Sequence, residues 1–499
     1  MNASVQPQEP AALKQALQAR PRQLLIGGKW RPAATGQVLD VFDPATGEIF
    51  AQAAAGGAGD IDAAVKAARQ ALEQGPWRST SPTERARLLW KLSDLIEANA
   101  AELALLETLD NGMPLWVAQM WNIPKAVECL RYYAGWPTRL TGETLPVSTP
   151  GEYHTYTRKE PMGVIGQIVA WNMPFGMAVG KIAPALAAGC TVVLKPAEQT
   201  PLSAVRLGEL IQEVGFPDGV VNIVTGTGEA AGRPLVEHPD VDKIAFTGST
   251  AVGKSILAAA AGTLKRVTLE LGGKSPVFIF PDADLEAATT AAANGIFFNT
   301  GQICAAGSRL FVHERIYDRV MDGVVSRAKG LKIGPGIERD TFMGPVVSSQ
   351  QLERVAGYVR CGREQGAEIV AGEQVLPEKG YFVRPMVLSN VGPQMTVMRE
   401  EIFGPVVCAL PFRDENLDAI ARVANDTSYG LSAYIWTSNV SIAHKLASRI
   451  KAGSISVNGG AGMDFTMPFG GFKQSGLGRE HGREGVEAYT ETKTVSITL

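Results

Sequence analysis

The 499-residue sequence contains few cysteines, and they form no recognisable pattern. Five cysteines lie far apart along the chain: Cys129, Cys190, Cys304, Cys361 and Cys408. Their number is odd and they include no C-x-x-C pair, so neither a disulfide framework nor a zinc site has the spacing that it needs. The pattern predicts reduced thiols in a cytoplasmic compartment and no metal site.

The sequence also lacks a large excess of charge and a long apolar run. Its net charge is -3, which gives no reason to expect nucleic acid or an acidic membrane surface as a partner. The longest charge-free stretch, 161–180, contains Gln167, Asn172, Pro174 and four glycines. This composition favours a buried strand followed by a turn over a membrane span. With 45% apolar residues, the chain is expected to be soluble and to form two or three domains.

What the sequence does contain, beyond residue 162, is an alternation of β-rich and helical runs. Strands are expected at 163–170, 191–194, 220–224, 243–246 and 266–269, and helices at 202–214, 230–237 and 251–261. Alternation at this spacing predicts parallel strands with right-handed crossovers, which is a doubly wound sheet. Ligands on such a sheet bind beyond the carboxyl ends of the strands, where this sequence has polar residues and glycines.

A second α/β unit and a pair of exposed strands are expected after that sheet. The strands of the second unit are expected at 276–280, 310–313, 406–411, 433–436 and 454–457. Polar and apolar residues alternate in the tail 493–499, which predicts a strand with one face to bury. A terminal strand of this kind can complete a sheet with a partner subunit, and the segment 138–161 is a candidate for the same sheet.

Two glycine-rich segments suggest binding of a phosphate group. Residues 248–255, GSTAVGKS, match the pattern G-x-x-x-x-G-K-[ST] directly after an expected strand, which predicts a phosphate-loop ATPase. Against this, the segment follows a late strand of its domain, and no apolar strand ending in a magnesium-binding Asp lies at a suitable distance. Residues 226–232, GTGEAAG, are a weaker dinucleotide-type signal. In either case, backbone N–H groups at a helix N-terminus would bind a phosphate or pyrophosphate.

One cysteine lies in a turn that a substrate could approach. Cys304 lies within FFNTGQICAAGSR, residues 297–309, between an Ala-rich helical run and a strand-like segment. A nucleophilic thiol needs such access, together with neighbours that favour the thiolate. A lone cysteine is more often a small buried apolar residue, so the catalytic interpretation depends on the rest of the chain.

Seven motifs, in their order and spacing, resemble the NAD(P)-dependent aldehyde dehydrogenase superfamily. They are WNMPF at 171–175, KPAEQTP at 195–201, FTGST at 246–250, LELGGKSP at 269–276, the segment 297–309, EEIFGP at 400–405 and PFGG at 468–471. The resemblance extends from about residue 22 to residue 499, and it outweighs the phosphate-loop match.

The resemblance implies an α/β fold with a Rossmann-like, doubly wound NAD-binding domain, an α/β catalytic domain and a small β oligomerisation arm. The implied bounds are 1–21 for an N-terminal extension, 22–138 and 162–272 for the NAD-binding domain, 273–472 for the catalytic domain, and 139–161 and 485–499 for the arm. The arm implies a homodimer or a homotetramer.

The resemblance also implies catalytic roles in the oxidation of an aldehyde. Cys304 is expected to add to the aldehyde carbonyl, giving a thiohemiacetal and then a thioester, while Asn172 and the Cys304 N–H stabilise the oxyanion. Glu270 is expected to be the general base that activates water for hydrolysis of the thioester. Transfer of the acyl group to coenzyme A would give Glu270 no role, so hydrolysis is favoured. Glu480 is similar to a carboxylate proposed for proton relay, with an ordinary ion pair as the alternative.

The residues implied to bind the cofactor are Lys195, Glu198, Gly248, Ser249, Gly253, Glu401 and Phe403. Lys195 and Glu198 match positions that bind the adenosine ribose. A carboxylate at Glu198 repels a 2′-phosphate, so NAD is favoured over NADP, although Lys195 leaves some use of NADP open. The loop 248–253 is expected to bind the pyrophosphate, Glu401 the nicotinamide ribose, and Phe403 the nicotinamide.

The residues implied to line a substrate tunnel are Met173, Met177, Gly180, Phe298, Ile303, Ala305, Met463, Phe465 and Phe469. The set is apolar and includes no Arg or Lys that could bind the carboxylate of a semialdehyde. Many relatives have a large aromatic residue where Gly180 stands, so this tunnel is expected to be wider. The expected substrate is a medium-sized hydrophobic or aromatic aldehyde such as phenylacetaldehyde, with betaine aldehyde and general aliphatic aldehydes as alternatives.

Overall fold

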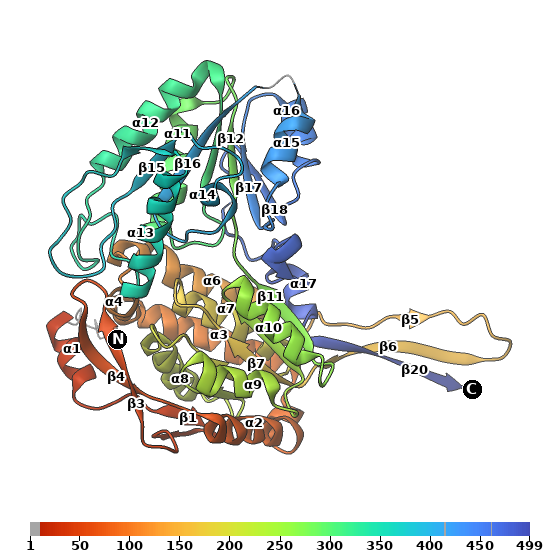
Figure 1. The fold of residues 1–499 in the computed structure, drawn as a ribbon. Helices are drawn as coiled ribbons and strands as arrows, with labels where there is room; N and C mark the ends of the chain where they lie inside the picture. The colour runs from red at the N-terminus through yellow and green to blue at the C-terminus, as the bar shows by residue number, and fades with distance from the viewer. Residues whose placement is uncertain (1–9, 414–415, 461) are drawn as a thin grey trace.

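The computed structural model describes residues 10–413, 416–460 and 462–499, which form two large sheets and two small ones. One large sheet lies in the lower body of Figure 1 and the other in the upper body, each with helices packed on it. A three-stranded sheet projects to one side. The expected α/β fold, with a doubly wound sheet, a second α/β unit and a small β arm, is confirmed.

The first large sheet has the strand order β19-β11-β10-β7-β8-β9-β1-β2. The bounds are Gly476–Leu477 (β19), Arg266–Glu270 (β11), Lys243–Thr247 (β10), Val164–Ile168 (β7), Thr191–Lys195 (β8), Val221–Ile223 (β9), Leu24–Ile26 (β1) and Lys29–Arg31 (β2). The five strands from β11 to β9 run parallel, and the outer strands pair antiparallel. These five strands lie within two residues of their expected positions, because each is a short apolar run buried between helices.

The helices of this lower body begin and end at recognisable signals. Their bounds are Ala58–Glu73 (α2), Pro82–Ala98 (α3), Ala100–Asn111 (α4), Leu115–Val117 (α5), Ile123–Ala134 (α6), Pro174–Ala188 (α7), Leu202–Val214 (α8), Arg233–Glu237 (α9), Thr250–Ala260 (α10) and Gly482–Glu487 (α17). The Ser81 hydroxyl caps α3 by accepting the N–H of Glu84 at 3.2 Å. α4 ends at Gly112, whose φ of +85° is easily adopted only by glycine.

Three helices were expected in this part of the lower body, and the one expected at 251–261 is confirmed by α10, which is displaced by one residue. α8 has the expected bounds, 202–214. The helix expected at 230–237 is instead divided into a π-helical turn, Gly228–Gly232 (η3), and α9. A second π-helical turn, Ala118–Asn122 (η2), joins α5 to α6.

The second large sheet has the strand order β14-β15-β16-β13-β12-β17-β18. The bounds are Glu368–Ala371 (β14), Met386–Ser389 (β15), Val406–Phe412 (β16), Arg309–His313 (β13), Pro276–Ile279 (β12), Ser432–Trp436 (β17) and Ser454–Val457 (β18). The helices around it are Leu285–Phe297 (α11), Tyr317–Gly330 (α12), Ser349–Glu364 (α13), Thr396–Arg399 (α14), Leu417–Asn425 (α15) and Val440–Ala447 (α16). The five expected strands are confirmed, whereas β14 and β15, which are only four residues long, were not expected.

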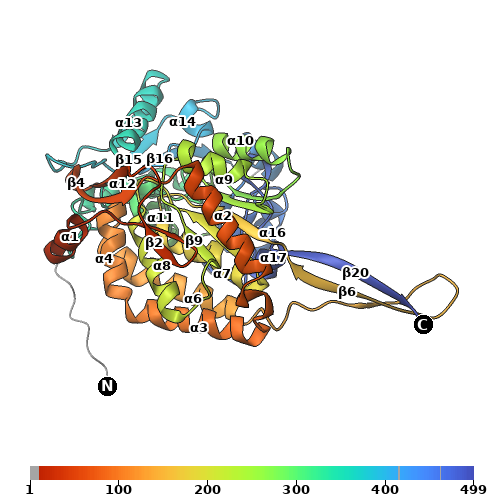
Figure 2. The ribbon, with the colours of Figure 1, turned by 90° about the horizontal axis from the view of Figure 1, so that it is seen from below.

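The projecting sheet consists of β5 (Thr144–Leu145), β6 (Tyr153–Pro161) and β20 (Thr490–Thr498), in the order β20-β6-β5. β20 and β6 pair antiparallel along their whole lengths. Figure 2 shows, from a second direction, that this arm extends away from both bodies. The expectation that the C-terminal strand and the segment 138–161 share one sheet is therefore confirmed.

The N-terminal helix α1 (Pro10–Gln18) lies beside a separate hairpin of β3 (Val38–Asp43) and β4 (Glu48–Ala54). Its Leu13 and Leu17 are buried in a small cluster with residues of that hairpin. Residues 1–9 of the expected N-terminal extension lie outside the described residues. Within the part of the chain that the structure describes, no helix is long and apolar enough to cross a membrane.

Candidate active site

The candidate site lies where the carboxyl ends of the first sheet meet the amino ends of the second. Asn172 follows β7 and Glu270 ends β11, both in the first sheet. Cys304 precedes β13 and Glu401 precedes β16, both in the second. The two edges are in contact, because the Asn172 side-chain amide donates to the carbonyl oxygen of Gln302 at 2.8 Å.

The turn that contains Cys304 has an unusual backbone that its neighbours hold in place. Asn299 and Thr300 have φ values of +47° and +57°, in the left-handed region that costs a non-glycine residue about 1–3 kcal/mol. The Asn299 side chain donates to the carbonyl of Asn172 at 2.9 Å, and the Thr300 hydroxyl donates to the carbonyl of Gly344 at 3.0 Å. These bonds offset the strain and present Cys304, which is partly exposed, at the junction of the two sheets.

The Asn172 amide is suited to stabilising an oxygen atom near this cysteine. The Asn172 side chain is only 3% exposed, and its amide nitrogen carries two N–H donors. One donor is used by the Gln302 carbonyl, and the Gln302 side chain is itself fixed, since its oxygen accepts the N–H of Val347 at 3.0 Å. The second donor remains for an oxygen at the site.

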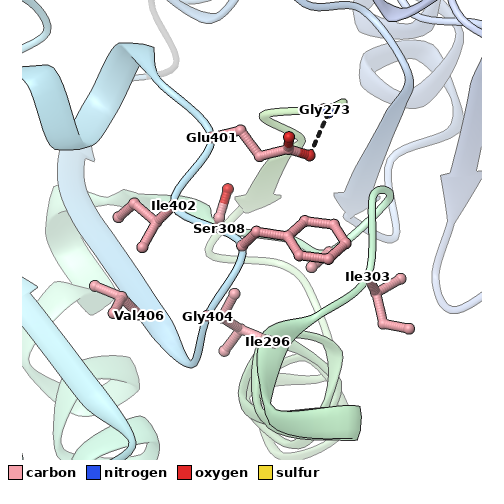
Figure 3. Close-up of a pocket in the computed structure, with 11 residues that line it drawn as sticks. Gly273, Ile296, Ile303, Ser308, Glu401, Ile402, Gly404 and Val406 are labelled. Atoms are coloured by element: carbon pink, nitrogen blue, oxygen red, sulfur yellow. Dashed lines mark hydrogen bonds between the residues drawn. The ribbon is translucent and has the colours of Figure 1, made fainter. Parts of the chain in front are cut away.

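Glu401, which precedes β16, lies close to the cysteine turn, since it lines the same cavity as Ile303. Its carboxylate accepts the backbone N–H of Gly273 at 2.8 Å, the dashed line in Figure 3. A Cβ atom at Gly273 would lie 2.3 Å from the Cys304 carbonyl oxygen, so only glycine allows these segments to approach. Burial raises the pKa of Glu401 to about 7, although the Gly273 N–H acts in the opposite direction.

The cavity beside Glu401, drawn in Figure 3, has a volume of about 10 Å³. Its lining includes Ile303, Ser308 and Phe403. A space of this size holds about one water molecule, so it is too small for an aldehyde or a dinucleotide.

The electrostatic surroundings of Cys304 keep its thiol protonated. Burial, followed by the negative charges of Glu401 and Glu270, raises the pKa of Cys304 to about 12. The backbone N–H of Ala305 acts in the opposite direction. A nucleophilic thiolate therefore requires a base that takes up the proton.

Glu270 is a buried carboxylate without a fixed hydrogen bond. It is 4% exposed, and neither of its side-chain oxygens has a hydrogen-bond partner among the described residues. Burial, together with the negative charge of Glu480, raises the pKa of Glu270 well above its ordinary value, while Lys181 and Arg479 act in the opposite direction. A carboxylate with a raised pKa is a stronger base than an ordinary one, which suits a general base.

Glu480 pairs with a lysine that the sequence analysis did not single out. Its carboxylate accepts a hydrogen bond from Lys181, which lies in α7 and is 1% exposed. A signal was available, because Lys181 is the one charged residue between 161 and 188. Lys181 and Glu270, which are buried, and Glu480, whose side chain is 19% exposed, thus form a group of charges beside the site.

The expected cofactor residues of the first sheet lie at its carboxyl edge. Lys195, at the end of β8, pairs with the Glu198 carboxylate at 2.9 Å. Burial lowers the pKa of Lys195, although Glu198 opposes that effect. Burial would raise the pKa of Glu198, but Lys195 and the N–H of Gly228 outweigh it and the pKa is lowered. The ionised, partly exposed carboxylate fits the expected acceptor of ribose hydroxyls.

The segment 248–255 does not have the form of an ATPase phosphate loop. α10 already begins at Thr250, and the side chain of Ser249 caps it. In a phosphate loop, the four variable residues between the two glycines form a loop around the phosphate, and the helix begins only after them. Gly253 instead lies inside α10 against Leu271, where a Cβ atom would be 2.6 Å away. The open N-terminus of α10 still presents backbone N–H groups of the kind that bind a pyrophosphate.

Phe298, an expected substrate residue, belongs to a group of aromatic side chains. The centroid of its ring lies 6.0 Å from the ring of Trp116 and 5.7 Å from that of Trp121, both nearly perpendicular to it. The Trp116 indole N–H donates to the carbonyl of Thr341 at 3.0 Å, which fixes this ring. The two tryptophans come from α5 and η2, far from Phe298 in sequence, and the sequence analysis missed them. Their aromatic character was the only available signal.

The other expected substrate residues near Cys304 come from two segments. Met173 and Met177 lie at the start of α7, and Met177 is partly exposed. A Cβ atom at Gly180 would meet no atom of the described residues within 4 Å, so the space beside it is open. Ile303 and Ala305 flank the nucleophile and are partly exposed.

Two further expected substrate residues line a separate pocket of about 200 Å³. Its lining consists of Lys125, Glu128, Tyr132, Met463, Asp464, Phe465 and Thr466. A lysine is therefore present beside the expected substrate residues, but Lys125 already pairs with Glu128 at 2.5 Å. Behind this pocket, the ring of His481 lies 4.8 Å from Phe465 and 5.8 Å from Phe469.

This geometry defines a class of enzyme. A partly exposed cysteine in a rigid turn, an amide donor beside it and a buried carboxylate without a fixed partner are the groups needed for covalent catalysis at a carbonyl carbon. The parallel sheet, with a helix N-terminus and a carboxylate at its carboxyl edge, is the type of scaffold that binds a dinucleotide.

Comparison with known proteins gives the family. The model of the aldehyde dehydrogenase family matches residues 30–495. Phenylacetaldehyde dehydrogenase of Pseudomonas fluorescens is 46% identical over 483 residues, covering 96% of each chain. Mitochondrial aldehyde dehydrogenase of Homo sapiens is 45% identical over 479 residues, covering 96% of this chain and 92% of the human one. The NAD+ complex of aldehyde dehydrogenase from Bacillus cereus has a TM-score of 0.95 and 48% identity, covering 99% of both chains.

The chain belongs to the aldehyde dehydrogenase family. It is an NAD-dependent oxidoreductase that oxidises aldehydes, so the expected family, activity and cofactor are confirmed.

Proposed function

We propose that this enzyme converts a medium-sized apolar or aromatic aldehyde to its carboxylic acid through a thioester on Cys304, which Glu270 helps to hydrolyse. The main support is the contact between Asn172 and Gln302, since it brings an amide donor of one sheet to the cysteine turn of the other. An aldehyde bound at this junction would place its carbonyl oxygen between the side-chain amide of Asn172 and the backbone N–H of Cys304.

In the first step, the sulfur of Cys304 forms a bond to the carbonyl carbon, and the π electrons of the carbonyl move to its oxygen. Asn172 and the Cys304 N–H stabilise the negative charge on that oxygen. The thiol proton passes to a base, and Glu270 is suited to this because its pKa is raised by burial and by Glu480. The product of the step is a thiohemiacetal.

The cofactor would be held by residues of both sheet edges. Bound NAD supplies the acceptor for the hydride that leaves the thiohemiacetal carbon. Glu198 would accept hydrogen bonds from the adenosine ribose, Glu401 would bind the nicotinamide ribose, and the start of α10 would face the pyrophosphate. The lowered pKa of Glu198 keeps it ionised, which disfavours the 2′-phosphate of NADP.

In the last step, Glu270 removes a proton from water while the water oxygen forms a bond to the thioester carbon. The bond between carbon and sulfur then breaks, and the thiolate of Cys304 leaves with its electron pair. Glu480 and Lys181 lie next to Glu270, so they are positioned to exchange the proton with it.

The substrate class rests on the side chains around the expected tunnel. Phe298 between Trp116 and Trp121 offers aromatic surface, on which a planar ring packs in offset or edge-to-face arrangements. The open space beside Gly180, where a Cβ atom would meet no described atom within 4 Å, supports a substrate that carries a ring. Lys125 already has Glu128 as a partner, so it gives little support to recognition of a second carboxylate.

The test is a screen of NADH absorbance with aromatic, aliphatic, betaine and semialdehyde substrates, using NAD and NADP in parallel. Phenylacetaldehyde should have the highest kcat/KM with NAD, and added coenzyme A should leave the carboxylic acid as the product. A semialdehyde as the best substrate, or formation of an acyl coenzyme A, would contradict the proposal.

A pair of variants at Gly180 tests the tunnel itself. Gly180→Trp should lower kcat/KM for phenylacetaldehyde by at least about 10-fold, because the indole fills the space, and should change acetaldehyde much less. Gly180→Ala is the matched control, since its Cβ meets no atom, and it should keep the wild-type preference. Equal loss for both aldehydes in Gly180→Trp would place the tunnel elsewhere.

We propose that the arm of β5, β6 and β20 joins the chain into a homodimer or a homotetramer. Support comes from its projection away from both bodies, which leaves the paired strands exposed. Light scattering of the purified enzyme tests the assembly, and a monomer at micromolar concentration would contradict it.

The five cysteines are all free, which supports a cytoplasmic location.

A further inference from the structure

The last turn of α4 is unusual because its polar side chains are buried. Glu107, Asp110 and Asn111 are fully buried, and Thr108 is 3% exposed. Burying a carboxylate or an amide costs several kcal/mol unless the group makes hydrogen bonds. The bonds that these residues make therefore indicate what the helix end contributes to the enzyme.

Two of these side chains bond to the backbone on either side of Asn172. A carboxylate oxygen of Glu107 accepts the N–H of Phe175 at 3.3 Å. The Asn111 side chain donates to the carbonyl of Trp171 at 2.7 Å. The segment that contains the oxyanion amide is thus tied to α4 before and after Asn172.

The same oxygen of Glu107 also reaches the segment that supplies the aromatic residues. It accepts a hydrogen bond from the Asn122 side chain at 2.6 Å. Asn122 ends η2, one residue after Trp121, and a Cβ atom at Gly176 would lie 2.5 Å from its side-chain oxygen. Glu107 therefore joins η2 to the start of α7.

The end of α4 also touches the support of the cysteine turn. A Cβ atom at Gly344 would lie 2.1 Å from the carbonyl oxygen of Gly112, so the two segments are in close contact. The Gly344 carbonyl in turn accepts the hydroxyl of Thr300 at 3.0 Å. One helix end thus contacts both the segment of Asn172 and the turn of Cys304.

We propose that Glu107 and Asn111 are positioning residues, which hold the Asn172 amide in the direction that the oxyanion on Cys304 requires. This inference rests on the proposed mechanism. Loss of a complete oxyanion donor costs about 10²- to 10³-fold in rate. A displaced donor keeps part of its effect, so loss of Glu107 should slow the chemical step by roughly 10- to 100-fold.

The variants separate positioning from general damage to the fold. Glu107→Ala removes the acceptor of the Phe175 N–H, whereas Glu107→Gln keeps an amide oxygen for it. Among the described residues, the other oxygen of Glu107 accepts no hydrogen bond, so the glutamine nitrogen can take its place. Asp110→Ala is the matched control, because the Asp110 carboxylate is equally buried but accepts the N–H of Leu202, at the start of α8, at 2.8 Å.

The measurement is single-turnover NADH formation in stopped flow, with saturating NAD and enzyme in excess over phenylacetaldehyde. Under these conditions, the rate of NADH formation depends on the steps up to and including hydride transfer, and deacylation does not contribute to it. The dissociation constant of NAD is measured in parallel and should not change, because neither side chain contacts the expected cofactor residues.

We expect Glu107→Ala to be roughly 10- to 100-fold slower than wild type, with Glu107→Gln and Asp110→Ala within about threefold of it. If Glu107→Ala does not fold, Asn111→Ala, which removes the bond to the Trp171 carbonyl, must show the same loss. Wild-type rates in the Ala variants, or equal losses in Glu107→Ala and Asp110→Ala, would overturn the positioning role. If the wild type forms no NADH from any aldehyde, the proposed function itself fails.

Discussion

The two large sheets contribute to the site from opposite ends of their strands. In the first sheet, the candidate residues end strands or follow them, as Lys195 ends β8 and Glu270 ends β11. In the second sheet they precede strands, as Cys304 does at β13 and Glu401 at β16. The site is therefore formed between a carboxyl edge and an amino edge, and each edge positions its side chains differently.

A strand end fixes a side chain through the sheet itself, whereas a loop before a strand needs other support. Lys195 and Glu270 have ordinary backbone angles. The loops that precede β13 and β16 contain three non-glycine residues with positive φ: Asn299, Thr300 and Phe403. Such residues cost about 1–3 kcal/mol each and persist only where their surroundings hold them. The amino edge thus stores strain at the nucleophile, and bonds from the other sheet keep it in place.

The largest expected effect comes from the amino edge. Cys304→Ala removes the atom that forms the covalent bond, so NADH formation from any aldehyde should fall by at least about 10⁴-fold. NAD should bind with unchanged affinity, since the expected ribose contacts lie at Glu198 and Glu401. Stopped-flow absorbance measures the rate of NADH formation, and quenching of tryptophan fluorescence by NAD measures the affinity for NAD.

Cys361→Ala is the matched control for this variant. Like Cys304, Cys361 is a free and partly exposed cysteine of the upper body, but it lies on α13. Its replacement should leave kcat within about twofold of wild type. Normal turnover in Cys304→Ala, or a comparable loss in Cys361→Ala, would remove Cys304 from the proposed mechanism.

The difference between the edges also explains what could be inferred from the sequence. Apolar runs gave the parallel strands within two residues, and the rule that ligands bind at carboxyl ends pointed to Lys195 and to the glycines after β10. No general rule points to the amino edge. The turn around Cys304 suggested only that its thiol could be reached, and the roles of Cys304 and Glu401 came from the family resemblance.

Contacts between distant segments were beyond the reach of the sequence. Trp116 and Trp121 meet Phe298 about 180 residues later in the chain, and such a pairing depends on how α5 and η2 pack on the cysteine turn. In the sequence, Lys181 and Glu107 look like an ordinary lysine and an ordinary glutamate of helices. Only the structure shows that both are buried. The phosphate-loop pattern was misleading because α10 begins at Thr250, which only the backbone reveals.

A variant at the carboxyl edge of the first sheet should lose a different step of the reaction from the one that Cys304→Ala loses. Glu270→Gln keeps the shape of the side chain but cannot accept a proton, so steady-state turnover should fall by about 10²- to 10⁴-fold. Where Glu270 serves thioester hydrolysis alone, the steps before deacylation need only Cys304 and Asn172, and these remain. A rapid burst of about one NADH per active site should therefore precede the slow phase, in contrast to Cys304→Ala.

Rapid-quench or stopped-flow measurement with phenylacetaldehyde distinguishes these cases. A burst with slow turnover assigns Glu270 to thioester hydrolysis. Absence of a burst, together with normal NAD binding, would mean that Glu270 is needed before the thioester forms, as the base that takes up the Cys304 proton. Unchanged turnover would contradict both roles.

The smallest effect should be a shift in pH dependence caused by the charges behind Glu270. Glu480 raises the pKa of Glu270 and Lys181 acts against that increase. Glu270 must be deprotonated to act as a base, so kcat falls as the pH decreases through its pKa. Glu480→Gln removes a negative charge, which lowers the pKa of Glu270 and should move the acid limb of kcat to lower pH. Lys181→Met removes a positive charge and should move it to higher pH.

Both variants break the same ion pair, but they should shift the acid limb of kcat in opposite directions. Each variant is therefore a control for the other. If the ion pair mattered only for folding, both variants would lower the amount of active enzyme and leave the position of the limb unchanged. The measurement is kcat against pH with saturating aldehyde and NAD, normalised to active sites titrated by alkylation of Cys304. Shifts in the same direction would show that the charge on Glu270 is not controlled by these neighbours, and that the carboxyl edge acts through geometry alone.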